Sequence, residues 1–151
     1  ANILVPADTR ILIAELSGVG KSYPLSAEKL SPVLAFYTVN DWEMGCDRCT
    51  EILNFGGMGH SVAVHSQNEQ VIQEFAFRKP AHRILINTVS AVGAVGYTTA
   101  LAPALSLGAG TIGGSITTDN ITPMHLLNIK RIGFEVNPVN DVNGDRIEEL
   151  T

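Results

Sequence analysis

Short apolar runs alternate with amphipathic, helix-like stretches along residues 9–88, and this alternation constrains the fold more than any other feature of the chain. Residues 9–16 and 32–39 read as buried strands, the second being rich in Val, Phe and Tyr. Further strands are predicted at residues 61–65 and 83–88. Strands that alternate with helices are typical of a parallel sheet covered by helices. The sequence therefore predicts an α/β fold, with a mostly parallel sheet and flanking helices.

Helix-capping signals locate the two helices between these strands. Asn40 with Glu43 has the spacing of a capping box, and Gly56-Gly57 ends the helix that follows. One face of this helix carries apolar and small side chains at helical spacing: Trp42, Cys46, Cys49 and Leu53. Ser66 with Glu69 repeats the capping-box spacing and opens the second helix.

The second half of the chain has a different character. Gly, Ala, Ser and Thr dominate residues 89–123, and a long stretch without clear elements is usually functional or packed against something else. A helical turn is predicted after Pro123, and residues 129–136 read as a closing strand. Residues 137–151 are polar and acidic. We therefore divide the chain into a domain at residues 1–136 and a polar tail or linker at residues 137–151.

Composition excludes several classes of partner. The chain has 151 residues, 45% of them hydrophobic, and a net charge of −5, which is the balance of one globular domain. No basic stripe is present, so we expect no nucleic-acid partner. No apolar run approaches the roughly 20 residues that span a bilayer, and no signal peptide is recognisable, so we expect no membrane association. Two cysteines favour a reducing, cytoplasmic compartment.

Gly108-Ala109-Gly110-Thr111-Ile112-Gly113 matches the GxGxxG string of dinucleotide-binding domains, and Glu135 follows at the distance that this fingerprint asks for. The fingerprint also needs a helix directly after it, whose N-terminus binds the pyrophosphate. Residues 114–123 are too β-branched and broken for that helix. We therefore favour a turn-rich segment near a pocket, and keep an independent dinucleotide-binding domain as an alternative.

No metal site is predicted. Cys46 and Cys49 form a C-x-x-C pair, but they lie inside a helix on its apolar face, which favours core residues over a redox pair or half of a zinc site. Residues 141–145 hint at a calcium loop, but the first and twelfth positions of that loop lack carboxylates. A simple turn is sufficient there.

Among the four histidines, His60 is the candidate for a functional role. It follows Gly56-Gly57-Met58-Gly59, and glycines that lead into a strand commonly present a side chain at a site. His65, His82 and His125 show no metal-binding spacing. Glu28 by itself reads as a solvated loop residue.

Several segments, in a fixed order over residues 9 to about 134, resemble CoA-acylating aldehyde dehydrogenases. The segments that carry the resemblance are Glu28-Lys29-Leu30-Ser31-Pro32-Val33-Leu34-Ala35-Phe36, Gly59-His60-Ser61, Arg83-Ile84-Leu85-Ile86-Asn87-Thr88, the Gly-rich run from Leu107 to Gly114, and Pro123-Met124-His125-Leu126-Leu127-Asn128. The resemblance implies the C-terminal part of the catalytic domain of the aldehyde dehydrogenase superfamily. It also implies an oxidoreductase that converts a short-chain aldehyde to an acyl-CoA with NAD and CoA.

The resemblance assigns roles to individual residues. Glu28 would approach the hydroxyls of the nicotinamide ribose, and Leu30 would pack near the nicotinamide. A carboxylate suits this task because it accepts hydrogen bonds from two hydroxyls at once. The substrate pocket would include Asn87, Thr88 and Ser90. The family's nucleophilic cysteine lies upstream of the Glu28 segment, so this chain would lack it and would be inactive alone.

The resemblance also implies partners. The strand around Ile129–Phe134 would be the family's oligomerisation strand, which pairs with a neighbouring subunit, and the upstream part of the same enzyme would complete the site. Val89 stands where relatives often carry Pro, and Ala109 where many carry Cys, so the pocket shape differs. The location would be the cytoplasm or a bacterial microcompartment. The alternative from another class is a non-catalytic binding or assembly module.

Overall fold

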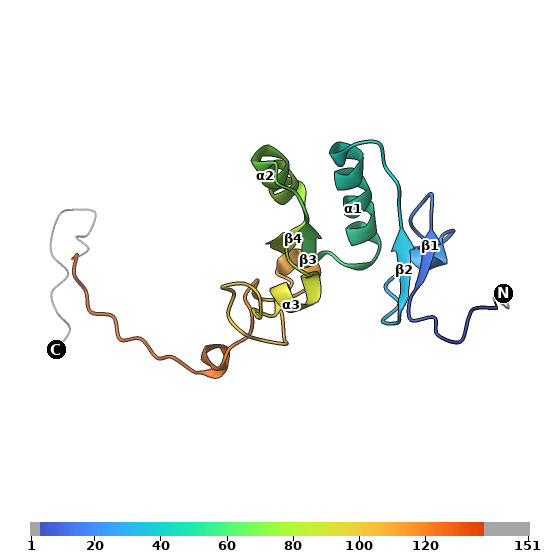
Figure 1. The fold of residues 1–151 in the computed structure, drawn as a ribbon. Coiled ribbons are helices and arrows are strands. Elements are labelled where there is room, and N and C mark those ends of the chain that lie inside the picture. Colours follow the sequence, from blue (N-terminus) through green and yellow to red (C-terminus); the bar gives the residue numbers. More distant parts are fainter. Residues whose placement is uncertain (1–3, 138–151) are drawn as a thin grey trace.

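The computed structural model describes residues 4–137 (Figure 1). The strands and α-helices in chain order are β1 (Leu12–Glu15), β2 (Val33–Phe36), α1 (Trp42–Gly56), β3 (Gly59–Val64), α2 (Glu69–Arg78), β4 (Ala81–Ile86) and α3 (Ser90–Ala94). Three 3-10 turns are added at Pro24–Ser26, Thr111–Gly113 and Pro123–Leu126. The polar tail predicted at residues 137–151 and the rejected calcium loop at residues 141–145 lie outside the described residues, apart from residue 137.

The strands form two separate parallel pairs. β1 pairs with β2, starting at Leu12 and Val33, and β3 pairs with β4, ending at Val64 and Ile86. Helix α2 makes the crossover between β3 and β4, as a parallel pair requires. The predicted α/β fold with parallel strands is therefore confirmed. Within the described residues the strands do not form one sheet, because β2 and β3 belong to different sheets and α1 joins the two pairs.

Helix α1 begins one residue later than predicted. Asp41, not Asn40, is the N-cap, and its Oδ1 accepts a hydrogen bond of 2.8 Å from the backbone N–H of Met44. The predicted apolar face is present, since Cys46 is 1% exposed and Leu53 is also buried. The helix ends at Gly56 with Gly57 as its C-cap, as the glycine pair indicated.

The N-cap of α2 lies two residues later than predicted, at Asn68 instead of Ser66. The side chain of Asn68 accepts hydrogen bonds from the backbone N–H groups of Gln70 and Val71, at 3.0 and 3.3 Å. The predicted cap, Ser66, instead accepts a hydrogen bond from the N–H of Asn68 and shapes the turn before the helix. The amide oxygen of Asn68 reaches two free N–H groups of the first turn, which is why it is the cap.

Lys79 joins the two helices from a buried position. Its ammonium group donates to the carbonyl oxygen of Cys46 and to Oγ1 of Thr50, the second at 2.8 Å. It also lies 4.9 Å from the centre of the Phe75 ring. Both cysteines of α1 are free thiols, and Cys46 is the more buried of the two. The prediction that Cys46 is a core residue is confirmed.

The region after β4 is only partly as predicted. The helix α3 at Ser90–Ala94 was missed, because five residues are too few to show a helical period. The helical turn after Pro123 is confirmed as a 3-10 turn. Residues 129–136, predicted as a strand, form no strand within the single described chain. A strand needs a neighbour to satisfy its backbone, and the described chain supplies none; Phe134 is 84% exposed.

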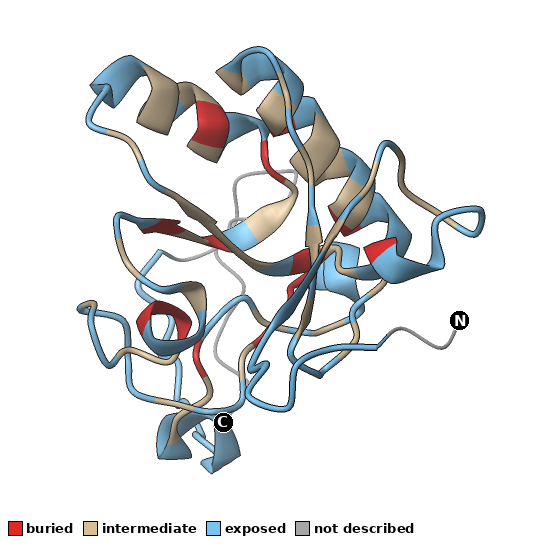
Figure 2. Ribbon diagram, turned by 45° about the vertical axis from the view of Figure 1, so that its right-hand side comes forward, coloured by how far each residue is buried: buried red, intermediate tan, exposed pale blue. Residues whose placement is uncertain are grey.

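The chain exposes more surface than a compact monomer of its size. Its accessible surface is 11,990 Å², whereas the size scaling of folded monomers gives ~7,400 Å². The buried residues form short patches in α1, α2, β4 and the loops near α3 (Figure 2). Ile13, Leu34 and Phe36 on the first strand pair are all at least half exposed. These apolar side chains indicate a surface that another part of the protein covers.

None of the helices within residues 4–137 combines the length and the apolar character that a membrane crossing requires.

Gly59→Ala is expected to destabilise the protein strongly. Gly59 has φ +78°, and an added Cβ would lie 2.0 Å from the carbonyl oxygen of Ala109. The strained backbone and this clash together predict a loss of about 2 kcal/mol or more in the free energy of unfolding. Urea unfolding of the purified protein measures it. Gly56→Ala is the matched control, because nothing lies within 4 Å of its Cβ; equal losses for both variants would contradict the close approach at Gly59.

Candidate active site

One cavity of about 410 Å³ gathers three of the residues that the sequence singled out: Glu28, His60 and Ser90. We name it the Glu28 cavity. Its remaining walls are largely small or apolar and come from the end of α1, from α3 and from Leu107. Four separate segments of the chain therefore converge on one hollow, which combines a carboxylate, an imidazole and a hydroxyl with apolar walls.

The loop that carries Glu28 is held by its neighbours. Ser26 is buried, and its hydroxyl accepts a hydrogen bond of 3.0 Å from the backbone N–H of Gly20. The Lys29 ammonium donates to the carbonyl oxygens of Leu25 and Ala27. Glu28 itself is exposed, and its carboxylate has no hydrogen-bond or ion-pair partner among the described residues. The carboxylate is therefore free to accept hydrogen bonds from a ligand.

Leu30 lies outside the Glu28 cavity, two residues beyond Glu28, in a strained backbone conformation. It has φ +45° and is 91% exposed. A branched aliphatic residue with positive φ is an outlier that costs roughly 1–3 kcal/mol. Leu30 therefore combines a strained backbone with an apolar side chain that projects into solvent.

His60 stands at the start of β3 and is exposed. Its backbone N–H donates to the carbonyl oxygen of Gly57 at 3.1 Å. The preceding residue, Gly59, packs against the carbonyl oxygen of Ala109, so only a glycine fits there. The glycines before His60 thus allow a close contact between β3 and the loop after α3. This contact fixes where His60 enters the cavity.

The three predicted pocket residues are not all at the cavity. Ser90, the first residue of α3, lines it. Asn87 has φ +53°, and its side-chain amide exchanges two hydrogen bonds with the backbone of Ser66, at 2.9 and 2.8 Å. The Thr88 hydroxyl lies 2.6 Å from that of Thr98. Asn87 and Thr88 therefore shape the turn between β4 and α3 and do not line the cavity.

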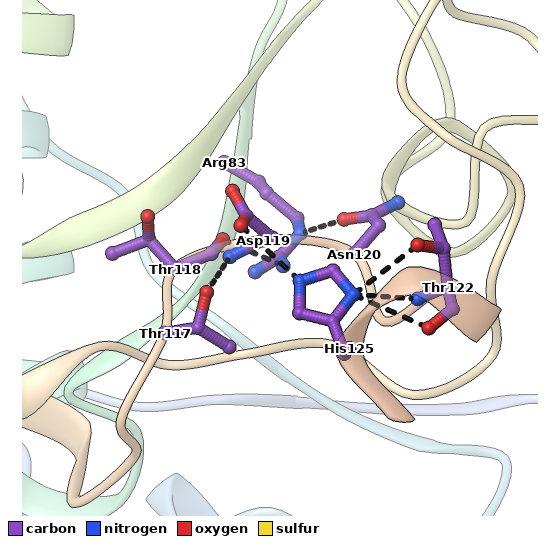
Figure 3. A network of polar contacts seen from close by, with 7 residues as sticks. All are labelled: Arg83, Thr117, Thr118, Asp119, Asn120, Thr122 and His125. Carbon is purple, nitrogen blue, oxygen red and sulfur yellow. Dashed lines mark hydrogen bonds and ion pairs between the residues drawn. The ribbon is translucent and has the colours of Figure 1, made fainter. Parts of the chain in front are cut away.

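A buried pair that sequence reasoning missed fixes the loop after α3. Arg83 is 4% exposed, and its guanidinium donates to Oδ1 of Asn120 at 2.6 Å (Figure 3). It also donates to the carbonyl oxygens of Gly108 and Thr118, at 2.7 and 3.0 Å. Burial lowers the pKa of this guanidinium, and Asp119 opposes the shift. We refer to Arg83 and Asn120 as the Arg83 clamp. A charged residue within an apolar strand was the one signal available in the sequence.

A hydrogen bond between His125 and Asp119 closes the outer side of this loop. Nε2 of His125 lies 3.3 Å from Oδ2 of Asp119, and its Nδ1 accepts a hydrogen bond of 3.0 Å from the backbone N–H of Thr122 (Figure 3). The hydrogen bond from His125, helped by Thr117, lowers the pKa of the Asp119 carboxyl. The Asp119 carboxylate is exposed, so this contact contributes little to the stability of the loop.

Several known proteins are similar to this chain in sequence. No family model matches the chain. An aldehyde-alcohol dehydrogenase of Streptococcus pneumoniae is 39% identical over 134 residues, which are 88% of this chain and 15% of that protein. The acylating sulfoacetaldehyde dehydrogenase of Cupriavidus necator is 35% identical over 83% of this chain and 26% of its own length.

Solved structures agree with these relatives. The crystal structure of an acetylating aldehyde dehydrogenase from Geobacillus thermoglucosidasius matches with a TM-score of 0.86 and 45% identity, over 92% of this chain. This chain is homologous to one segment of the acylating aldehyde dehydrogenases. It spans 31% of that Geobacillus chain and 15% of the aldehyde-alcohol dehydrogenases. The family resemblance seen in the sequence is therefore confirmed, and so is the fold that it implied.

The rival sites are weaker. The segment Gly108–Gly113 lies in a loop with a single bridge between Leu107 and Asn120, and no helix follows Gly113 before Pro123. It therefore lacks the helix N-terminus of a dinucleotide-binding domain. Burial raises the pKa of the Cys49 thiol, so this cysteine is not activated. Within residues 4–137, no group of three or more metal-binding side chains comes together.

NAD fits the Glu28 cavity on the chemistry of its walls. A ribose needs acceptors for its hydroxyls, and the unpartnered Glu28 carboxylate supplies them. A nicotinamide ring needs apolar contacts, which Leu30 beside the cavity can provide. The cavity is partly open to solvent.

The Asp119–His125 pair predicts a defined pH dependence. The folded-state pKa of Asp119 is lowered, so its contribution to stability is present above the unfolded carboxyl pKa of about 3.9 and is lost as pH falls through the folded value. Asp119→Asn should therefore unfold more easily than the wild type at pH 6, and the difference should vanish in acid. Urea unfolding at several pH values measures this, with Asp47→Asn on α1 as the control. A pH-independent difference for Asp119→Asn would contradict the assignment.

Proposed function

We propose that this chain is part of an acylating aldehyde dehydrogenase, which converts a short-chain aldehyde, NAD and CoA to acyl-CoA and NADH. Its contribution is the ribose-binding side of the NAD site, part of the aldehyde pocket and a subunit contact. The convergence of Glu28, His60 and Ser90 on one cavity carries the proposal. Its sequence and fold similarity to acylating and acetylating aldehyde dehydrogenases supports it.

Each residue at the cavity has a task in this scheme. NAD, when bound, supplies the oxidant, and CoA supplies the thiol that carries away the acyl group. Glu28 accepts hydrogen bonds from the ribose hydroxyls, and Leu30 packs beside the nicotinamide. His60 faces the same space and orients a polar group of the cofactor or the aldehyde. Ser90 borders the aldehyde pocket, while Asn87 and Thr88 hold the turn that places it.

The nucleophile comes from elsewhere in the enzyme. Cys46 is buried, and its helix holds it away from the Glu28 cavity lining. Cys49 has a raised pKa, whereas a nucleophilic thiol requires a lowered one. We therefore assign the attacking cysteine to the upstream part of the same protein, and we expect this chain to be inactive alone.

The exposed apolar segments serve assembly. Leu126, Ile132 and Phe134 are each more than 80% exposed on a stretch that finds no strand partner among residues 4–137. Pairing of residues 129–136 with a strand edge of a second subunit would cover them. The enzyme is then a homo-oligomer, located in the cytoplasm or in a bacterial microcompartment. A non-catalytic assembly module would expose the same surface and is the alternative.

NADH formation separates these functions. A short aldehyde is supplied with and without CoA, to this chain alone and to the protein extended upstream. NADH formed only by the extended protein, and faster with CoA, supports the acylating dehydrogenase. Turnover by this chain alone would overturn the assignment of the nucleophile. No NADH from either protein would favour the assembly module.

Glu28→Gln is expected to weaken NAD binding in the active protein. The amide keeps one acceptor oxygen but loses the charge, and charge-assisted hydrogen bonds contribute roughly 1.5–3 kcal/mol. The KM for NAD should therefore rise by about tenfold or more, with a smaller effect on the KM for the aldehyde. Glu43→Gln, an exposed substitution in the first turn of α1, is the matched control. Unchanged steady-state kinetics for NAD in Glu28→Gln would remove Glu28 from the cofactor site.

A further inference from the structure

We propose that Arg83 and Asn120 are positioning residues for the aldehyde pocket, because they fix the side of the Glu28 cavity that α3 and Leu107 build. The inference rests on the proposed function and goes beyond it, since neither side chain lines the cavity. They act through the carbonyl groups that they hold.

Arg83 has an unusual set of hydrogen-bond partners. All three of its hydrogen bonds go to neutral oxygens, those of Asn120, Gly108 and Thr118, and none goes to a carboxylate. A buried cation that lost these oxygens would be left without hydrogen-bond acceptors, which strongly destabilises a protein. Hydrogen bonds from an ionised donor are also stronger than neutral ones. The loop oxygens are therefore held in place by the charge of Arg83.

The side-chain amide of Asn120 connects Arg83 to α3 by hydrogen bonds. While its Oδ1 accepts from Arg83, its Nδ2 donates to the carbonyl oxygens of Ala94 and Ala102, at 2.9 and 2.7 Å. Ala94 is the last residue of α3 and lines the Glu28 cavity. A helix has unpaired carbonyl groups in its last turn, and Asn120 satisfies one of them.

Leu107 is also connected to this pair, through Asn120. Leu107 lines the cavity and forms an antiparallel bridge with Asn120. The next residue, Gly108, gives its carbonyl oxygen to Arg83 and its N–H to the carbonyl oxygen of Asp119 at 2.8 Å. A Cβ at Gly108 would lie 2.3 Å from the carbonyl oxygen of Thr117, so the two chain segments pack as closely as backbones can.

The Glu28 side of the cavity is not bonded to this pair. Glu28 follows the turn at Pro24–Ser26. The clamp makes no hydrogen bond to that segment. Disturbing the clamp should therefore move the Ser90–Ala94 and Leu107 side while leaving the ribose side in place. This asymmetry separates a positioning role from a general loss of stability.

Asn120→Asp is the sharpest variant for the test. The carboxylate of this variant still accepts a hydrogen bond from Arg83, but it lacks the two N–H groups of the amide. The last residue of α3, Ala94, therefore loses its hydrogen bond to this side chain. Arg83→Lys is the second variant, because it keeps the charge but loses the planar fork that bonds three oxygens. Asn54→Asp on the exposed side of α1 and Arg10→Lys are matched controls. Each is made in the full-length enzyme that carries this chain.

Both variants should raise the KM for the aldehyde by roughly tenfold, as expected for misplacement within a pocket, with the KM for NAD changed less than twofold. A variant that was only less stable would lower the active fraction and leave both KM values unchanged. Hydrogen exchange of the backbone amides supplies a second readout. Protection should fall at Gly93 and Gly108 and persist in β3.

Unchanged aldehyde KM in both variants, or equal rises for aldehyde and NAD, would overturn the proposal. If Asn120→Asp does not fold, Arg83→Lys provides the same comparison. A wild-type enzyme without aldehyde-dependent NADH formation would refute the proposed function instead. Hydrogen exchange would then still test the role of the Arg83 clamp. A loss of amide protection confined to α3 and residues 107–110 supports this role, and a uniform loss of protection across the protein contradicts it.

Discussion

The buried guanidinium of Arg83 is the interaction on which the second half of the structure depends. A cation placed inside β4 has to be surrounded by oxygens, and the chain meets this need by bringing a loop back from 37 positions away. This loop brings Asn120 into hydrogen-bonding contact with the end of α3 and holds Leu107 at the cavity. The glycines and small residues of this loop follow from the same constraint, because backbone carbonyls can approach the guanidinium only where side chains are absent or short.

A second constraint comes from what the chain leaves uncovered. Two parallel strand pairs with open edges, an accessible surface of 11,990 Å², and exposed residues such as Phe36 and Phe134 do not describe a domain that buries its own core. The chain spans 31% of the acetylating aldehyde dehydrogenase chain that it resembles, and the rest of the proposed enzyme would cover this surface.

Local patterns in the sequence predicted much of this architecture, and long-range contacts account for what they missed. Apolar runs and the α1 face located the strands and helices of residues 12–86 within a few residues, but β1 and β2, predicted as buried strands, are exposed or half-buried. The helix caps were misplaced by one or two residues because each helix start offers more than one capping side chain, Asn40 or Asp41 for α1 and Ser66 or Asn68 for α2. The partner of Arg83 has no signal in spacing or composition. Glu28 was singled out only through a family resemblance, because the residue alone looks like any solvated loop glutamate.

A structure of the complete enzyme with NAD bound tests the central claim most directly. The claim is that this chain provides the ribose side of a cofactor site centred on Glu28. The account predicts both oxygens of the Glu28 carboxylate within hydrogen-bonding distance, about 2.5–3.0 Å, of the nicotinamide ribose hydroxyls, with Leu30 against the nicotinamide ring. A cofactor bound at Gly108–Gly113, or a ribose that lies away from Glu28, would contradict it.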